Sequence, residues 1–230
     1  MWIMAQSWHD LLFAHWPVKP ADLRRHLPPG LELDLFDGAA WIGVVPFRMT
    51  GIRPRGLPPV PGISSFVEIN VRTYVTARGR GGVWFFSLDA SNEIAVEAAR
   101  GWFHLPYFNA VMECRRRGDE IAYASRRTHR GAAKAEFRGR YRPTSTASRT
   151  RPGTLEHWLT ERYSLFATYR GALVRADVSH DPWPLQAAHA DIELNTMADA
   201  VAPLPSTAPL LHFAKRLDVT VTAPQRLIAP

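Results

Sequence analysis

The sequence of 230 residues holds one cysteine, Cys114, and only three lysines, Lys19, Lys134 and Lys215. A single cysteine excludes an intramolecular disulfide framework and a zinc site built from cysteines, and it is typical of proteins of the reducing cytoplasm. No stretch reaches the roughly 18 consecutive apolar residues of a membrane helix, and no basic segment followed by an apolar run opens the chain. We therefore expect a cytoplasmic protein that is neither exported nor inserted in a membrane.

Several motifs that carry chemistry are also absent. The sequence has no glycine-rich phosphate loop, no dinucleotide-binding fingerprint, and no Gly-x-Ser-x-Gly element around Ser64 or Ser65. Its nine histidines include no His-x-x-x-His pair with the close spacing of metal ligands. We therefore expect no cofactor and no metal, and the sequence gives no support to serine-hydrolase chemistry.

Arginine supplies most of the positive charge. Lysine and arginine total 28 residues against 21 acidic ones, a net charge of +7 that would normally suggest nucleic acid or an anionic surface as a partner. The densest run, Arg115 to Arg117, precedes Gly118-Asp119 and is typical of a hairpin tip, and no nucleic-acid reading motif accompanies it. We expect no nucleic-acid partner, and at most weak duplex binding with a steep salt dependence.

A chain of this length lies at the upper end of one domain and can bury roughly 70 to 75% of its unfolded surface. We expect one domain over residues 1–230. Many short strands in mostly hairpin order, with a few short helices, favour an α+β fold dominated by antiparallel sheet. Proline at position 46 predicts an edge or a bulge in its strand. The predicted strands are 11–18, two within 31–49 around Asp37-Gly38, 64–76, 83–88, 107–116, 120–128, 132–141, 173–178, 186–194 and 210–222; the predicted helices are 20–26, 92–105, 155–163 and 196–201.

The stretch 64–76, SSFVEINVRTYVT, has an unusual polar face. Alternation places Val67, Ile69, Val71, Thr73 and Val75 on an apolar face of the strand. The opposite face carries an aromatic ring, a carboxylate, an amide, a guanidinium and a phenol, supplied by Phe66, Glu68, Asn70, Arg72 and Tyr74. Such a face suits either a solvated sheet surface or the polar lining of a barrel or cone, and the two interpretations stay open at this point.

The order of motifs resembles a known family. The pattern includes Pro20-x-x-Leu23-x-x-x-Leu27-Pro28, the strand from Ser65 to Arg72, Trp84-Phe85-Phe86-Ser87-Leu88-Asp89, Leu105-Pro106-Tyr107-Phe108, Leu159-Thr160-Glu161-Arg162-Tyr163 and His180-x-Pro182-Trp183. Together these motifs resemble the YqjF-like proteins, a domain family of unknown function, over nearly the whole chain. That family is similar in turn to the acetoacetate decarboxylase superfamily. The resemblance implies an antiparallel β-cone around a pocket, with helices packed outside.

The same resemblance implies that the imine-forming lysine of the decarboxylases is missing from this sequence. In the decarboxylases, a Gly-x-Pro-Lys-Lys segment supplies the lysine that forms an imine with the substrate ketone. The matching run here places Tyr107 and Phe108 where the two lysines would stand, and a phenol cannot form an imine. The central-strand glutamate of those enzymes is matched by Glu68. Lys215 shares its strand phase with apolar residues, so it either points inward or, as we favour, reaches the rim of the pocket.

Three functional interpretations follow from the sequence. The first is a protein that binds a small organic acid or carbonyl compound through Glu68, Asn70, Arg72, Tyr74 and Tyr107, without imine-forming decarboxylase activity. The second is a lyase- or isomerase-type enzyme in which Glu68 is the acid or base and Tyr107 a hydrogen-bond donor. The third is a non-catalytic assembly or interaction protein. A homo-oligomer is compatible with all three, and the sequence assigns no role to His180 or Arg162.

Overall fold

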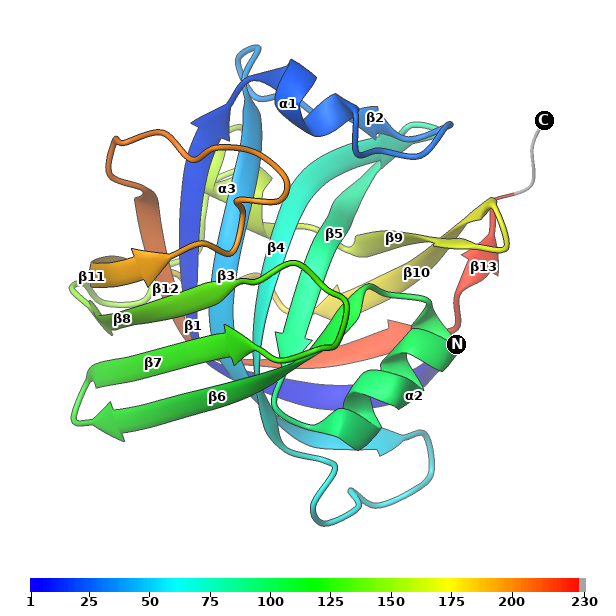
Figure 1. The fold of residues 1–230 in the computed structure, drawn as a ribbon, viewed down its shortest axis with the longest axis horizontal. Coiled ribbons are helices and arrows are strands. Elements are labelled where there is room, and N and C mark those ends of the chain that lie inside the picture. Colours follow the sequence, from blue (N-terminus) through cyan, green and yellow to red (C-terminus); the bar gives the residue numbers. More distant parts are fainter. Residues whose placement is uncertain (228–230) are drawn as a thin grey trace.

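Thirteen strands and three short helices make up residues 1–227, the part of the chain that the computed structural model describes (Figure 1). The elements are β1 Trp2–Val18, α1 Pro20–Arg24, β2 Glu32–Leu33, β3 Ala40–Pro54, β4 Phe66–Ala77, β5 Arg80–Ala90, α2 Glu93–Phe103, β6 Tyr107–Arg117, β7 Glu120–Arg127, β8 Glu136–Pro143, α3 Leu155–Thr160, β9 Ser164–Tyr169, β10 Ala172–His180, β11 Gln186–Asn195, β12 Leu210–Thr222 and β13 Gln225–Arg226. The predicted α+β fold with mainly antiparallel strands is confirmed.

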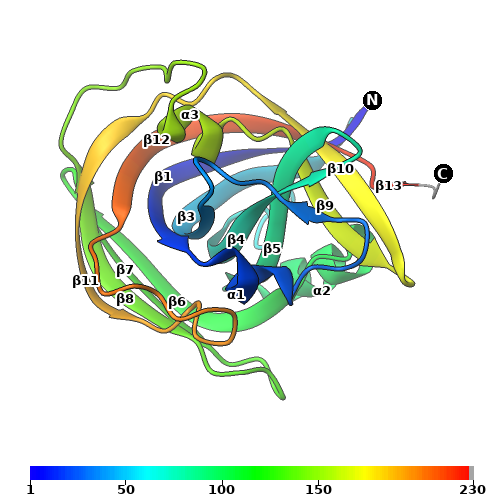
Figure 2. The same cartoon turned by 90° about the horizontal axis from the view of Figure 1, so that it is seen from above.

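Seven of the strands close into a ring. Each of β1, β3, β4, β5, β9, β10 and β12 pairs with the next, and β12 pairs with β1 to complete the circuit. Figure 2 looks down into this cone. All of its pairings are antiparallel except the short parallel contact between β5 and β9. A closed ring has no free sheet edge along its wall, and its inward-facing side chains enclose an interior.

The strands β6, β7, β8 and β11 form a second layer outside the cone (Figure 1). This layer begins where β6 pairs in parallel with the end of β5 and returns to the cone where β11 pairs with β12. Apolar side chains fill the space between the layers, with Ile69 and Val71 of β4 facing Ile121 of β7 and Phe137 of β8 in one buried cluster. The apolar face predicted for the strand 64–76 therefore packs against the outer layer, and its polar face turns into the cone.

The helices and long loops lie at the two ends of the cone. The loop 55–65 and α2 lie at the end where β4 begins, whereas α1, β2 and α3 lie toward the end where β4 finishes (Figure 1). Asn92 caps α2 by accepting a hydrogen bond from the Ala95 N–H at 3.0 Å, as residues of this type do at helix starts. The helix stops at His104, whose φ of 55° is left-handed. At 11 residues α2 is the longest helix in the described part of the chain, and none there could cross a bilayer.

Long-range pairing changes several of the predicted elements. Strand β1 runs for 17 residues instead of the predicted 11–18, because it pairs along its length with both β3 and β12. Strand β9 was not predicted. The segment 196–201 forms turns rather than a helix. The strand before Asp37-Gly38 pairs with β4 and not with the strand after the turn. The edge or bulge predicted for the strand of Pro46 is not found there, because β3 pairs on both sides and the extra residue of the nearby register shift lies in β1.

Candidate functional site

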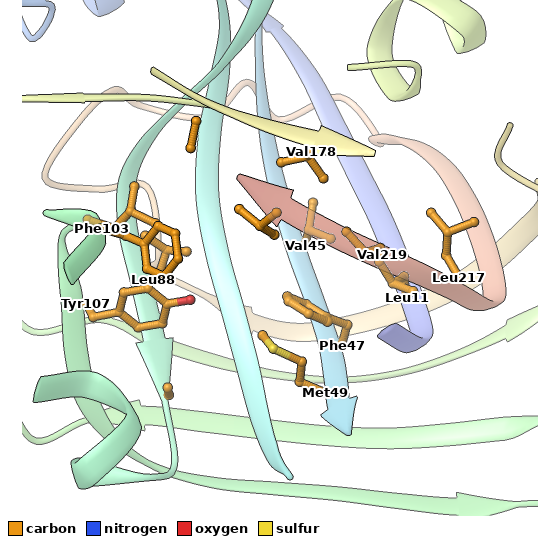
Figure 3. Close-up of a cluster of buried hydrophobic side chains, with 14 of the residues drawn as sticks. Leu11, Val45, Phe47, Met49, Leu88, Phe103, Tyr107, Val178, Leu217 and Val219 are labelled. Carbon is orange, nitrogen blue, oxygen red and sulfur yellow. The ribbon is translucent and has the colours of Figure 1, made fainter. Parts of the chain in front are cut away.

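A cavity of about 370 Å³ occupies the interior of the cone. Its walls are mostly apolar, and Figure 3 shows part of them, with Tyr107 projecting from β6 beside Leu88 and Phe103 and facing Phe47 and Met49 of β3. Few polar groups interrupt this lining. Glu68, Asn70 and Arg72, successive inward residues of β4, line the cavity together with Tyr107. The solvated-surface interpretation of this strand is therefore wrong, because Glu68 and Asn70 are only 2% and 4% exposed.

Glu68 and Tyr107 form a buried pair at the end of the cavity near α2. The Tyr107 hydroxyl donates a hydrogen bond of 2.8 Å to Oε2 of Glu68. Burial in apolar surroundings raises the Glu68 pKa to about 8, and the charge of Asp89 acts in the same direction. The hydroxyl of Tyr107 and the neighbouring amide of Asn70 act in the opposite direction. Burial, followed by the charge of Glu68, holds the Tyr107 pKa well above its ordinary value.

These pKa shifts define what the pair can do at neutral pH. Most of the Glu68 carboxyl is protonated there, so it can donate a hydrogen bond or a proton to a carbonyl oxygen of a ligand. Tyr107 keeps its proton and acts as a donor. The deprotonated minority of Glu68 can accept a proton. The pair is thus suited to bind a carbonyl group and to general acid–base chemistry on it.

Arg72 lies further along β4 and has no ion-pair partner in the part of the chain that the structure describes. Its guanidinium carbon lies 5.3 Å from the ring centroid of Phe13 and 5.8 Å from that of Tyr74. Its buried Nε has no hydrogen-bond partner in residues 1–227, and no carboxylate of that range forms an ion pair with it. The Oδ1 atom of Asn70 is buried and likewise without a partner among these residues. Unpartnered polar atoms of this kind in a cavity wall are typical of positions that a ligand satisfies.

Tyr74 occupies a different place from the one we predicted. It is fully buried on the same side of β4, but it does not line the cavity. Its hydroxyl lies 2.6 Å from Nε2 of His15, and its ring lies 4.8 Å from that of Trp158. These two side chains fill the space that alternation alone would leave open. Tyr74 therefore closes the upper end of the cone instead of facing the cavity.

Arg162 and His180 line the cavity, although the sequence assigned neither of them a role. Arg162 follows α3 and donates from Nε to the Trp158 carbonyl and from Nη1 to Asp34, both at 2.6 Å. Its side chain is 10% exposed, and its Nη2 has no partner within residues 1–227. The signal was present in the sequence as the motif Leu159–Tyr163, but nothing local places that motif inside the cone.

The motif 180–183 lies beside the motif 159–163. Glu161 accepts a hydrogen bond of 2.9 Å from the backbone N–H of Trp183, and the ring of His180 stacks on Tyr163 with centroids 4.6 Å apart. Trp183 is buried, stacks on Trp8 and lines the cavity. The motifs 159–163 and 180–183 thus hold each other in place and build one wall together.

Comparison with known proteins agrees with this architecture. The model of a family described as uncharacterized conserved proteins, DUF2071, matches residues 5–218. The chain belongs to this family. It is 49% identical over 220 residues to the uncharacterized protein YqjF of Bacillus subtilis (strain 168), which covers 95% of this chain and 90% of that protein. The resemblance to YqjF-like proteins drawn from the motifs is confirmed.

Solved structures with the same fold are acetoacetate decarboxylase-like proteins. An acetoacetate decarboxylase-like enzyme from Sphingomonas wittichii RW1 has a TM-score of 0.66 at 17% identity, covering 99% of this chain and 94% of that one. Acetoacetate decarboxylase from Legionella pneumophila has a TM-score of 0.64 at 13% identity, with 97% and 87% covered. The enduracididine biosynthesis enzyme MppR, solved in complex with pyruvate, has a TM-score of 0.68 at 16% identity, with 98% and 90% covered. At these identities the likeness shows the fold alone.

None of the three lysines, all of which lie within residues 1–227, lines the cavity. Lys19, Lys134 and Lys215 are all exposed. Lys215 and Arg216 are exposed in succession, so the alternation of β12 shifts at this point. Phe213 accordingly faces the outer cluster, whereas Leu217 faces the inner one. The inward alternative for Lys215 is therefore not found.

Proposed function

We propose that this protein binds a small organic acid or carbonyl compound in the cavity of its cone, without imine-forming decarboxylase activity. The observation that carries the proposal is a mostly apolar cavity to which Glu68, Asn70, Arg72 and Tyr107 contribute polar groups. Cavities of this kind, apolar with a few convergent polar groups and a perturbed pKa, are typical of small-molecule sites. The raised pKa of Glu68 fits a ligand whose polar group accepts a hydrogen bond.

Binding is tested with a panel of small carboxylic acids and carbonyl compounds, including pyruvate and acetoacetate, by the shift in Tm on thermal denaturation. Members that bind should raise Tm. The variant Ala99→Phe places a ring in the cavity wall and should abolish the shift, because Ala99 lines the cavity. Ala187→Phe, at an exposed position on β11, is the matched control. A panel without any shift, or shifts that survive Ala99→Phe, would contradict the proposal.

The absence of imine chemistry is tested separately. Imine formation needs a neutral amine in the pocket, and the three lysines are exposed. Incubation with acetoacetate or acetylacetone and borohydride should leave the intact mass unchanged. Acetoacetate decarboxylase from Legionella pneumophila is the positive control. A reduced adduct that maps to Lys215 and disappears in Lys215→Gln would show that the chemistry has moved to β12.

A second candidate is an enzyme that uses Glu68 as its acid or base. The buried pair with Tyr107 and a pKa of about 8 favour it, because general acids work best when their pKa lies near the working pH. Any ligand found with the panel is then followed by NMR in deuterium oxide. Exchange of a proton next to its carbonyl group, lost in Glu68→Gln while binding persists, would establish this candidate over simple binding.

A further inference from the structure

The guanidinium groups of Arg72 and Arg162 both lie near the ring of Tyr74, at the upper end of the cavity. The guanidinium carbon of Arg72 lies 5.8 Å from the centroid of Tyr74, and that of Arg162 lies 5.1 Å from it. Both side chains line the cavity, although they come from distant parts of the chain. Tyr74 is itself held by His15, so the ring is a fixed platform for both cations.

The two cations at this end have only one counter-ion among the described residues. Asp34 pairs with Arg162, and Arg72 has no acidic partner there. Arginine stays charged even when it is buried, so the charge of Arg72 cannot be lost by deprotonation. One buried donor on each arginine, Nε of Arg72 and Nη2 of Arg162, also lacks a hydrogen-bond partner in residues 1–227. An anion with a single negative charge and two acceptor oxygens would balance the charge of Arg72 and accept hydrogen bonds from both arginines.

At the opposite end, beyond Glu68 and Tyr107, the cavity is apolar out to its rim. Val60 of the loop 55–65 and Ile94 and Trp102 of α2 line the cavity and are nevertheless 49%, 65% and 66% exposed. Asn92 donates a hydrogen bond of 2.8 Å to the Gly62 carbonyl and ties the loop to the start of the helix. A ligand that enters here meets hydrocarbon first. Exposed apolar side chains gathered at one rim are typical of a route for an apolar ligand.

The distance between Glu68 and Arg72 along β4 indicates how long the ligand is. Glu68 and Arg72 are four residues apart on one strand, which separates their Cα atoms by roughly 13 Å. A compact acid such as acetate or pyruvate at Arg72 would leave the apolar remainder of the cavity empty. A longer apolar body would fill it and pass Glu68 and Tyr107 on the way to α2.

We propose that the ligand class of this site is the amphipathic monocarboxylates, with the carboxylate held by Arg72 and Arg162 and the apolar chain directed toward α2 and the loop 55–65. The inference rests on the proposed binding function and narrows it to one chemical class. It also assigns Arg162 as a second ligand-binding residue beside Arg72.

The wild-type protein provides the first test. Isothermal titration at neutral pH compares octanoate with three probes that each remove one feature: 1-octanol lacks the charge, octylamine reverses it, and acetate lacks the chain. Octanoate should bind about tenfold or more tightly than each of the others, because only it offers both the carboxylate and the chain. Equal binding of octanoate and 1-octanol would overturn the anion site, and equal binding of octanoate and acetate would overturn the apolar chain.

Variants locate the carboxylate. Arg72→Met and Arg162→Met should each weaken octanoate binding by about tenfold and leave 1-octanol binding unchanged. Arg140→Met, at an exposed position on β8, is the matched control and should change neither. Arg72→Met breaks none of the ion pairs found within residues 1–227, so this variant still tests the carboxylate site if Arg162→Met fails to fold.

The outcomes separate the two levels of the proposal. Octanoate binding that is unaffected by Arg72→Met would overturn this inference and leave the cavity-binding function standing. Binding of acetate or pyruvate alone would do the same. If neither these four probes nor the wider panel binds, both the inference and the proposed function fail.

Discussion

The two ends of the cavity differ in the charge of their buried ionisable groups. At the end near α2, burial raises the pKa of the Glu68 carboxyl to about 8, so the group is largely neutral at pH 7. At the other end, Arg72 is charged and has no acidic partner among the described residues. Both residues come from one face of β4. A carboxyl can shed its charge by binding a proton, whereas a guanidinium in a protein cannot lose its own.

This difference indicates which end relies on a ligand. At the Glu68 end the carboxyl already has a partner in the protein, since Tyr107 donates a hydrogen bond to it. The Arg72 end keeps a charge and buried donors without partners in residues 1–227. Polar groups left in this state cost stability in the free protein, and a ligand that pairs with them recovers it.

The largest effect should come from Glu68 and pH. Its pKa is about 8 in the folded protein and about 4.5 as a free side chain, so folding favours the protonated form. The stability from this group is fully present below about pH 4.5 and is lost as the pH rises through 8. Relative to Glu68→Gln, the free energy of unfolding of the wild type should fall by on the order of 4 kcal/mol across this window.

Urea denaturation of both proteins between about pH 5 and about pH 9 measures this difference. Glu193→Gln, which changes an exposed carboxyl on β11, is the control for replacing a glutamate outside the cavity. A constant difference between wild type and Glu68→Gln would show that Glu68 ionises as readily in the cone as in water.

The two arginines should differ in their contribution to stability. Arg162→Met leaves Asp34, which is mostly buried, without its cation and the Trp158 carbonyl without a donor, so the free energy of unfolding should fall by roughly 3 kcal/mol. Arg72→Met breaks no ion pair and removes an unpartnered buried donor, so its effect should stay within about 1 kcal/mol. Urea denaturation in the absence of ligand measures both. The reverse order would mean that Arg72 has a partner in the free protein.

The smallest effect should come from the Tyr107 hydroxyl. Tyr107→Phe removes the hydrogen bond to Glu68 and should reduce the free energy of unfolding by about 1 kcal/mol. Because this hydroxyl lowers the Glu68 pKa, the variant should also raise that pKa above about 8. The carbon-13 shift of the Glu68 carboxyl, followed by NMR against pH, reports the change. Tyr163→Phe, whose hydroxyl bonds Glu161 nearer the surface, should leave the Glu68 titration unchanged.

Local pattern was enough to predict much of the wall of the cavity. Side chains alternate along any strand, so the order of residues in β4 places Glu68, Asn70 and Arg72 on one face wherever that strand lies. The capped helix α2 and the hairpin between β6 and β7 are also local, since their caps and turn residues adjoin them in sequence. The family followed from motifs that are contiguous in the chain.

Which residues each strand face contacts depends on the tertiary structure. Tyr74 shares the inward face of β4, but His15 and Trp158 fill the space before it, and both come from elements far away in the sequence. Arg162 reaches the cavity only because it lies between α3 and β9, a strand of the cone wall, and Lys215 is exposed where the alternation of β12 shifts. The order of residues along a strand is enough to predict the chemistry of each of its faces, because alternation is a property of the backbone. Which faces enclose the cavity depended on pairings between strands distant in the chain, and no local pattern encodes them.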